Sequence, residues 1–123
     1  MIKKIVIVVI MLFVFLVSCS KEPEIKYIEE VARVFNIEYD GIERSYYVYV
    51  PNETLEGAPL LMMLHGFGST LEYFVEDTKL RELADRDKVV LVYPLGTPTL
   101  GINHWDANLD FNEVDDVGFL TML

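Results

Sequence analysis

The stretch "LLMMLHGFGST", residues 60–70, joins an apolar run to a glycine-containing turn. Its first five residues are all apolar, which predicts a strand covered on both faces, as in a parallel sheet. His65 ends the run, and Gly66 and Gly68 follow it closely. Because glycine adopts backbone conformations that other residues avoid, the sequence predicts a tight turn directly after the strand.

A helix and a second strand are predicted after this turn. Residues 69–87, "STLEYFVEDTKLRELADRD", have helical apolar spacing, and Ser69 with Glu72 forms a capping-box pattern. The spacing changes phase near Asp77, which predicts a kink or two short helices. "KVVLVYP", residues 88–94, predicts a second buried strand that a proline closes.

The flanking segments complete an α/β pattern. Residues 31–51, "VARVFNIEYDGIERSYYVYVP", predict two strands joined at Asp40-Gly41, a strong hairpin signal. Residues 95–113 predict a loop, and residues 114–123, "VDDVGFLTML", predict the start of a helix. This order predicts an α/β fold with a right-handed crossover between parallel strands.

The first residues of the chain resemble a secretory signal. Lys3 and Lys4 precede an unbroken apolar run of 13 residues, from Ile5 to Val17. The run is shorter than the roughly 20 residues that a membrane-spanning helix needs. A basic start followed by a short apolar core predicts a signal peptide over residues 1–18.

Cys19, the single cysteine, directly follows this segment. "LVSC", residues 16–19, resembles a bacterial lipobox, which implies cleavage before Cys19 and lipid attachment to its thiol. A plain signal peptide with an incidental cysteine is the alternative. We expect a lipid-anchored tether over residues 19–30, a partial domain over residues 31–123, and an extracytoplasmic location, lipid-anchored to the bacterial membrane or secreted.

The charge balance excludes several classes of partner. Without Lys3 and Lys4 the chain has 8 basic and 20 acidic residues, a net charge of 8 − 20 = −12. Nucleic-acid binding requires a basic surface, so no nucleic-acid partner is expected. The same acidity disfavours electrostatic attachment to anionic lipid, so any membrane link is expected to run through lipidated Cys19.

Four stretches carry a resemblance to a known family: "RSYYVYVP", "LLMMLHGFGST", "LADRDKVVLVYPLG" and "VDDVGFLTML". In order and spacing they resemble the N-terminal half of an α/β-hydrolase fold, and in particular the secreted esterases of the polyhydroxybutyrate depolymerase and feruloyl esterase group. The resemblance implies an ester substrate, a polyester or a plant-polysaccharide ester, and no cofactor. It also implies that the backbone N–H of Phe67 contributes to an oxyanion hole, with Gly66 and Gly68 permitting the turn.

Other polar residues have simpler explanations. His65 is interpreted as a packed structural residue, because the family's general base comes later in the chain. Ser69 is interpreted as a helix cap, since "GFGST" is not a G-x-S-x-G elbow. His104 and Trp105 either line a substrate cleft or pack their loop onto the core, and the sequence leaves both alternatives open.

The acidic pair near the end of the sequence receives no catalytic role. Asp115 and Asp116 are expected to cap and pack the final helix, where its dipole favours acids. They also do not predict a metal site, because no histidine or third carboxylate stands at a convincing spacing.

The sequence contains no catalytic triad. After the signal, the serines are Ser20, Ser45 and Ser69, and none lies in a G-x-S-x-G elbow. We therefore expect an ester hydrolase truncated before its nucleophile elbow and inactive by itself, whose full-length parent uses an acyl-enzyme mechanism. The alternatives are a non-catalytic surface lipoprotein that serves as a binding or structural module, and a fragment complemented by a separate C-terminal chain.

Overall fold

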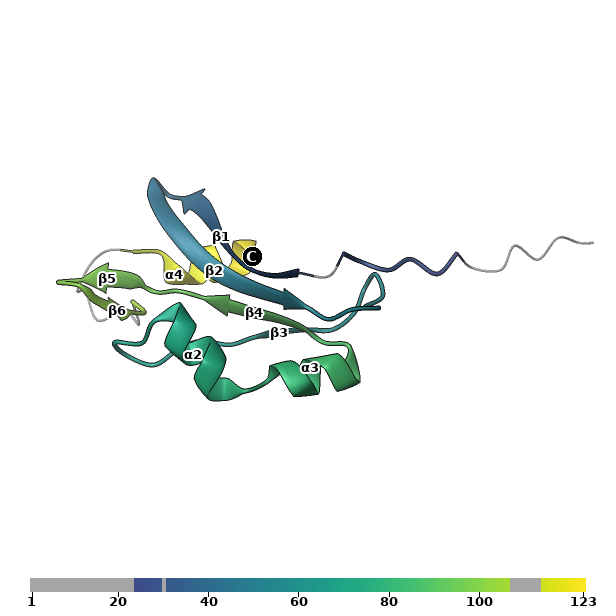
Figure 1. The fold of residues 1–123 in the computed structure, drawn as a ribbon. Helices are drawn as coiled ribbons and strands as arrows, with labels where there is room; N and C mark the ends of the chain where they lie inside the picture. The colour runs from purple at the N-terminus through teal and green to yellow at the C-terminus, as the bar shows by residue number, and fades with distance from the viewer. Residues whose placement is uncertain (1–23, 30, 107–113) are drawn as a thin grey trace, which may run out of the picture.

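A four-stranded mixed sheet forms the centre of the molecule (Figure 1). The computed structural model of the chain describes residues 24–29, 31–106 and 114–123. The strand order is β1-β2-β4-β3, in which β2 is antiparallel to both β1 and β4, and β3 is parallel to β4. These strands are β1 (Val31–Tyr39), β2 (Ile42–Val50), β3 (Leu60–Met62) and β4 (Val90–Pro94).

The first hairpin has the predicted position and turn. Tyr39 pairs with Ile42, which leaves Asp40 and Gly41 as a two-residue loop. Both loop residues have positive φ, 51° and 73°, as a type I′ turn requires. The prediction from Asp40-Gly41 is therefore confirmed.

Two short helices connect the parallel strands, as the phase change in the sequence predicted. They are α2 (Leu71–Thr78) and α3 (Arg81–Asp87), and Lys79 between them has a left-handed φ of 51°. The predicted Ser69 cap is wrong by one residue. Thr70 is the N-cap, and its hydroxyl accepts from the Tyr73 N–H. Ser69 instead belongs to the preceding turn, where its carbonyl accepts a hydrogen bond from Asn103.

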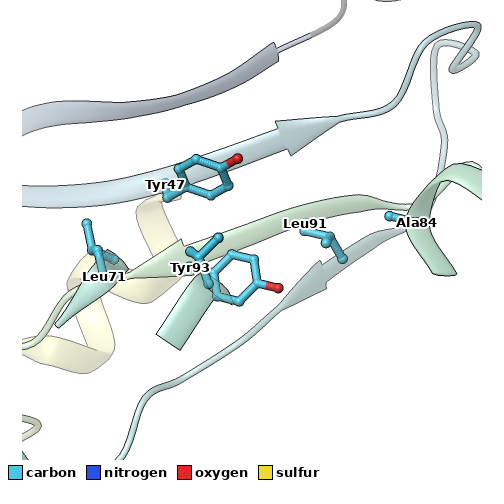
Figure 2. Close-up of a cluster of buried hydrophobic side chains, with 6 residues drawn as sticks. Tyr47, Leu71, Ala84, Leu91 and Tyr93 are labelled. Carbon is cyan, nitrogen blue, oxygen red and sulfur yellow. The ribbon is translucent and has the colours of Figure 1, made fainter. Parts of the chain in front are cut away.

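The hydrophobic core lies between the sheet and these two helices (Figure 2). Tyr47 of β2 meets Tyr93 of β4 edge-on, at 6.0 Å between ring centroids. The other residues of this buried cluster are Leu71, Val75, Ala84 and Leu91.

The apolar strand β3 is less covered than its sequence predicted. It is parallel to β4, as expected, but it is the last strand in the order, and Leu60 is 53% exposed. Leu61 and Leu64 are also exposed. This exposure of the side chains makes the expectation of two covered faces wrong for the described residues. As the last strand in the order, β3 also has a neighbouring strand on one side only.

A second hairpin lies where the sequence predicted a loop. It consists of β5 (Thr97–Thr99) and β6 (Ile102–His104), which pair antiparallel. Leu100 and Gly101 form its turn with φ values of 52° and 80°. The prediction failed because leucine is not a residue expected in such a turn.

The helix α4 (Asp116–Met122) is joined to the sheet by a buried ion pair. The guanidinium of Arg44, on β2, lies 2.6 Å from Asp116, and both side chains are almost fully buried. Arg44 also lies over the ring of Phe119, at 4.0 Å from its centroid. The second carboxylate oxygen of Asp116 accepts from the Asp106 N–H, so this pair connects β2, α4 and the segment after β6.

The predicted signal over residues 1–18 and Cys19 lie outside the described residues. Part of the predicted tether is described, and it is hydrogen-bonded to the domain: the Ile28 N–H donates to the Thr54 carbonyl, and the Glu56 N–H to the Lys26 carbonyl. In the described ranges, no helix is long and apolar enough to cross a membrane.

We predict that Asp116→Asn lowers the free energy of unfolding by about 3–5 kcal/mol, because it leaves the buried Arg44 without a counter-charge. Urea unfolding of the full chain measures this change. The matched control is Glu56→Gln, which breaks the exposed Lys26–Glu56 pair and is expected to cost no more than about 1 kcal/mol. A loss at Asp116 as small as that at Glu56 would contradict a structural role for the buried pair.

Candidate functional site

The segment between β3 and α2 forms a hydrogen-bonded β-turn over Gly66–Ser69. The Ser69 N–H donates to the Gly66 carbonyl at 3.3 Å. Gly68 has a φ of +78°, whereas Phe67 is not among the residues with positive φ. This combination defines a type II turn, with Phe67 at its second position and glycine at its third, where a positive φ is required. Gly68 therefore has the turn-forming role that the sequence predicted for it, whereas Gly66 does not have a positive φ.

The buried ring of His65 holds this turn against the loop after β4. Its Nε2 accepts from the Gly96 N–H at 2.9 Å, and its Nδ1 lies 2.7 Å from the Gly66 carbonyl oxygen. Because Gly96 supplies a donor and Gly66 an acceptor, the ring is neutral and carries its proton on Nδ1. Both ring nitrogens are thus used within the protein, which agrees with His65 as a packed residue.

At Gly96 the loop after β4 comes very close to the backbone of β6 and to the His65 ring. A Cβ added to Gly96 would lie 2.2 Å from the His104 carbonyl oxygen and 3.3 Å from the His65 Nε2. No side chain fits at such distances without displacing the backbone of β6. The absence of a side chain therefore allows the two loops and the His65 ring to meet.

β6 fixes the other side of the turn. The Gly68 N–H donates to the Asn103 carbonyl at 2.8 Å, and the Asn103 side-chain amide donates to the Ser69 carbonyl at 2.9 Å. Together with the His65 contacts, these bonds hold the turn at both ends. The turn is consequently preorganised by the fold.

The backbone N–H of Phe67 is an unused donor of this turn. Within the described ranges, no hydrogen bond engages it or the N–H of Gly66, while the N–H groups of Gly68 and Ser69 both have acceptors. The Phe67 side chain is 79% exposed, so the residue lies at the surface. An unpaired N–H on a fixed, accessible turn is available to bind an oxygen acceptor.

The structure separates the two residues proposed for a substrate cleft. Trp105 donates its indole N–H to the His65 carbonyl at 3.0 Å, and its ring lies 5.0 Å from the His65 ring. Trp105 thus packs its loop onto the core. The His104 ring instead stacks on the Phe67 ring, at 6.2 Å between ring centroids, and His104 is one of the residues that line a surface pocket.

Asp115 and Asp116 both act at the start of α4. Asp115 is the N-cap and accepts from the Gly118 N–H, as predicted, and it also accepts from the Tyr39 hydroxyl at 2.8 Å. The Gly118 hydrogen bond is the main cause that lowers the pKa of Asp115, and the Tyr39 hydrogen bond adds to it. The same hydrogen bond raises the pKa of Tyr39.

No group of three or more metal-ligating side chains occurs in the part of the chain that the structure describes.

Sequence reasoning missed two residues of this site, Gly96 and Asn103. Both residues lie in the loop that the sequence predicts over residues 95–113. Their partners are 31 and 34 residues away along the chain. No local pattern reports contacts of that range, although a glycine directly after an apolar strand is a signal for close approach.

Comparison with known proteins gives one partial relative. A segment of 66 residues is 36% identical to a bifunctional acetylxylan esterase/xylanase of Neocallimastix patriciarum. The segment covers 54% of this chain but 10% of that enzyme, so the chain spans about a tenth of its relative. No family model and no solved structure matches the chain. The partial similarity, at low identity, indicates a relationship to a carboxylic-ester hydrolase.

We predict that Asp115 makes stability fall at acidic pH. Its pKa in the folded chain lies below the ordinary value of 3.8, so the ionised carboxylate stabilises the fold above that value. This contribution is lost as the pH falls through the lowered pKa. Asp115→Asn keeps a capping oxygen but removes the charge, and its melting temperature should therefore fall less than that of the wild type between about pH 5 and about pH 2.

Thermal unfolding monitored by circular dichroism at several pH values measures this difference. Tyr39→Phe removes one of the two hydrogen bonds to Asp115 and should give an intermediate slope. Parallel pH profiles for the wild type and Asp115→Asn would contradict the assignment.

Proposed function

We propose that residues 31–123 belong to a carboxylic-ester hydrolase of the polyhydroxybutyrate depolymerase and feruloyl esterase type, within an α/β-hydrolase fold. In this proposal the Phe67 N–H is one of the donors of the oxyanion hole. The single observation that supports it most is the unused Phe67 N–H on a turn held by His65 and Asn103. The partial relationship to an acetylxylan esterase/xylanase supports the same class of reaction.

The chemistry of ester hydrolysis explains why such a donor is useful. When a serine oxygen attacks an ester carbonyl, a C–O bond forms and the carbonyl π electrons move onto oxygen. A fixed N–H stabilises this negative charge without reorganising during the reaction. A general base takes the serine proton and passes it to the alcohol oxygen as the ester C–O bond breaks, so that the alcohol leaves. Water then hydrolyses the acyl-enzyme, which releases the acid and regenerates the serine.

The location of the turn also supports the proposal. The turn follows a parallel strand and precedes a helix, which is the structural context in which α/β-hydrolases place one oxyanion-hole N–H. The arrangement of β3, the turn and α2 provides the donor at the end of the sheet where parallel strands lead into loops.

The remaining catalytic groups lie outside this sequence. None of its serines stands in a G-x-S-x-G elbow, and His65 is engaged at both ring nitrogens. The nucleophile, acid and base therefore come from a longer product or from a separate chain, and residues 1–123 alone are inactive. Anchoring through lipidated Cys19 at the cell envelope is part of the same proposal.

A second candidate is a non-catalytic surface lipoprotein that serves as a binding module, which the exposed turn with its unpaired Phe67 N–H also fits. In that case the same turn would bind an oxygen acceptor without breaking a bond. The two candidates differ in whether the native product contains a reactive serine.

The first test is the native product itself, isolated from the source cells. Intact mass gives its size, and a fluorophosphonate probe labels any activated serine. We expect a labelled species larger than residues 19–123, or a labelled partner chain that copurifies with this one. An unlabelled product that hydrolyses no acyl ester would contradict the esterase proposal and favour the binding module.

The second test uses the product in which the probe finds a reactive serine, assayed without the probe. In this product, Phe67→Pro removes the backbone N–H of residue 67. Proline is well tolerated at the second position of a type II turn, so the turn itself should survive. We expect kcat for an acetyl ester to fall about 10²- to 10³-fold. Phe67→Ala removes the same side chain but keeps the N–H, so the ratio of the two kcat values isolates the hydrogen bond. Equal kcat values for these two variants would contradict the assigned donor.

A further inference from the structure

The tip of the β5–β6 hairpin carries a leucine in an unfavourable position. Leu100 is 98% exposed and has a φ of 52°. The β1–β2 hairpin offers a comparison within the same chain, because its turn, Asp40-Gly41, has nearly the same φ values as Leu100-Gly101. At the matched position one hairpin has aspartate, which suits this backbone and water, and the other has leucine, which suits neither.

Such a residue costs stability, because a left-handed backbone is strained for a side chain without a short polar group. The exposed leucine offsets none of this cost, since its apolar surface gains nothing from burial in the free chain. Backbone strain that persists at a surface loop commonly marks a functional position. Leu100 is accordingly better explained by what it contacts in a complex than by the fold of the free chain.

Leu100 lines a pocket beside the Phe67 turn. The pocket has a volume of about 240 Å³ and is lined by Phe67, Thr99, Leu100, Ile102 and His104. None of these side chains carries a carboxylate, an ammonium or a guanidinium group. The His104 Nε2 is hydrogen-bonded to the Thr99 hydroxyl at 2.7 Å, so these two polar groups already satisfy each other. The pocket therefore favours an apolar group.

We infer that this pocket binds the apolar part of an ester, a group of about six carbons, while the Phe67 N–H binds the carbonyl oxygen. This inference rests on the proposed function and adds a specificity-determining residue, Leu100. Phe67 connects the two parts, because it lines the pocket and also carries the unused N–H. A cavity of about 150 Å³ with apolar walls holds a benzene ring, so about 240 Å³ is ample for six carbons.

A lipid bilayer is the other apolar partner that such a tip suggests. The described residues nearest the predicted anchor, 24–29, lie at the opposite end of the molecule from the β5–β6 hairpin (Figure 1). The pocket is also a concave site, and one of its lining residues, Phe67, carries the unused N–H, which suits a single small group with one acceptor. The bilayer is therefore kept as an outcome of the test.

The test measures binding by the full chain and needs no catalysis. Ethyl hexanoate is titrated against the wild type, Leu100→Asn and Val117→Asn, with methyl NMR signals of Ile102 as the reporter and ethyl acetate as the short-chain probe. Asn-Gly is a preferred type I′ turn, so Leu100→Asn should raise the melting temperature while it removes the apolar wall. Val117, 72% exposed on α4, gives a matched control outside the pocket.

We expect Leu100→Asn to weaken ethyl hexanoate binding at least about tenfold, and Val117→Asn to leave it unchanged. Ethyl acetate should bind much more weakly than ethyl hexanoate. Loss of affinity together with a higher melting temperature distinguishes a binding role from a structural one.

Three results would overturn the inference. They are unchanged affinity in Leu100→Asn, equal affinity for the two esters, and Leu100-dependent flotation with phosphatidylcholine vesicles in the absence of ethyl hexanoate binding. Binding of ethyl hexanoate by a native product without a reactive serine would contradict the esterase proposal alone. Hydrolysis of acetyl esters by a product whose pocket binds no ethyl hexanoate would contradict this inference alone.

Discussion

The imidazole ring of His65 fixes the relation between the loops that follow the two parallel strands. One ring nitrogen serves the Gly66 carbonyl within its own loop, and the other accepts the Gly96 N–H of the neighbouring loop. Loss of the ring would leave a buried N–H without an acceptor, at a cost of about 1–3 kcal/mol. The turn that presents the Phe67 N–H begins directly after this ring, so its position depends on His65.

A chain of contacts connects the same ring to the buried ion pair. Trp105 covers one side of it, and the backbone N–H of the next residue, Asp106, donates to Asp116. Asp116 in turn pairs with Arg44 on β2. The buried ion pair thereby holds α4 and the Trp105 segment against the sheet. The stability of the proposed site and the packing of the domain therefore depend on one connected set of contacts.

The sequence predicts those features of the fold that are local. Asp40-Gly41 identifies the first hairpin because the turn chemistry lies within two residues. The phase change near Asp77 predicts a kink or two short helices, and the structure has two helices there. The second hairpin escaped prediction because Leu100 contradicts ordinary turn chemistry. The exposure of Leu60 depends on strand order, and the partners of Gly96 and Asn103 depend on long-range contacts, which no local pattern contains. The proposed apolar pocket explains why Leu100 departs from ordinary turn chemistry. This agrees with the general association of locally unfavourable residues with function.

The most direct test of this account is the protonation state of the His65 ring, measured by two-bond ¹H–¹⁵N correlation NMR on the full chain at neutral pH. The chain has two histidines, so His104→Asn assigns the ring signals of His65. We expect a neutral ring protonated on Nδ1, with Nε2 as a hydrogen-bonded acceptor. A ring protonated on Nε2, or an imidazolium, would mean that Gly96 is not held by His65, and it would contradict the preorganised turn on which the proposed oxyanion site depends.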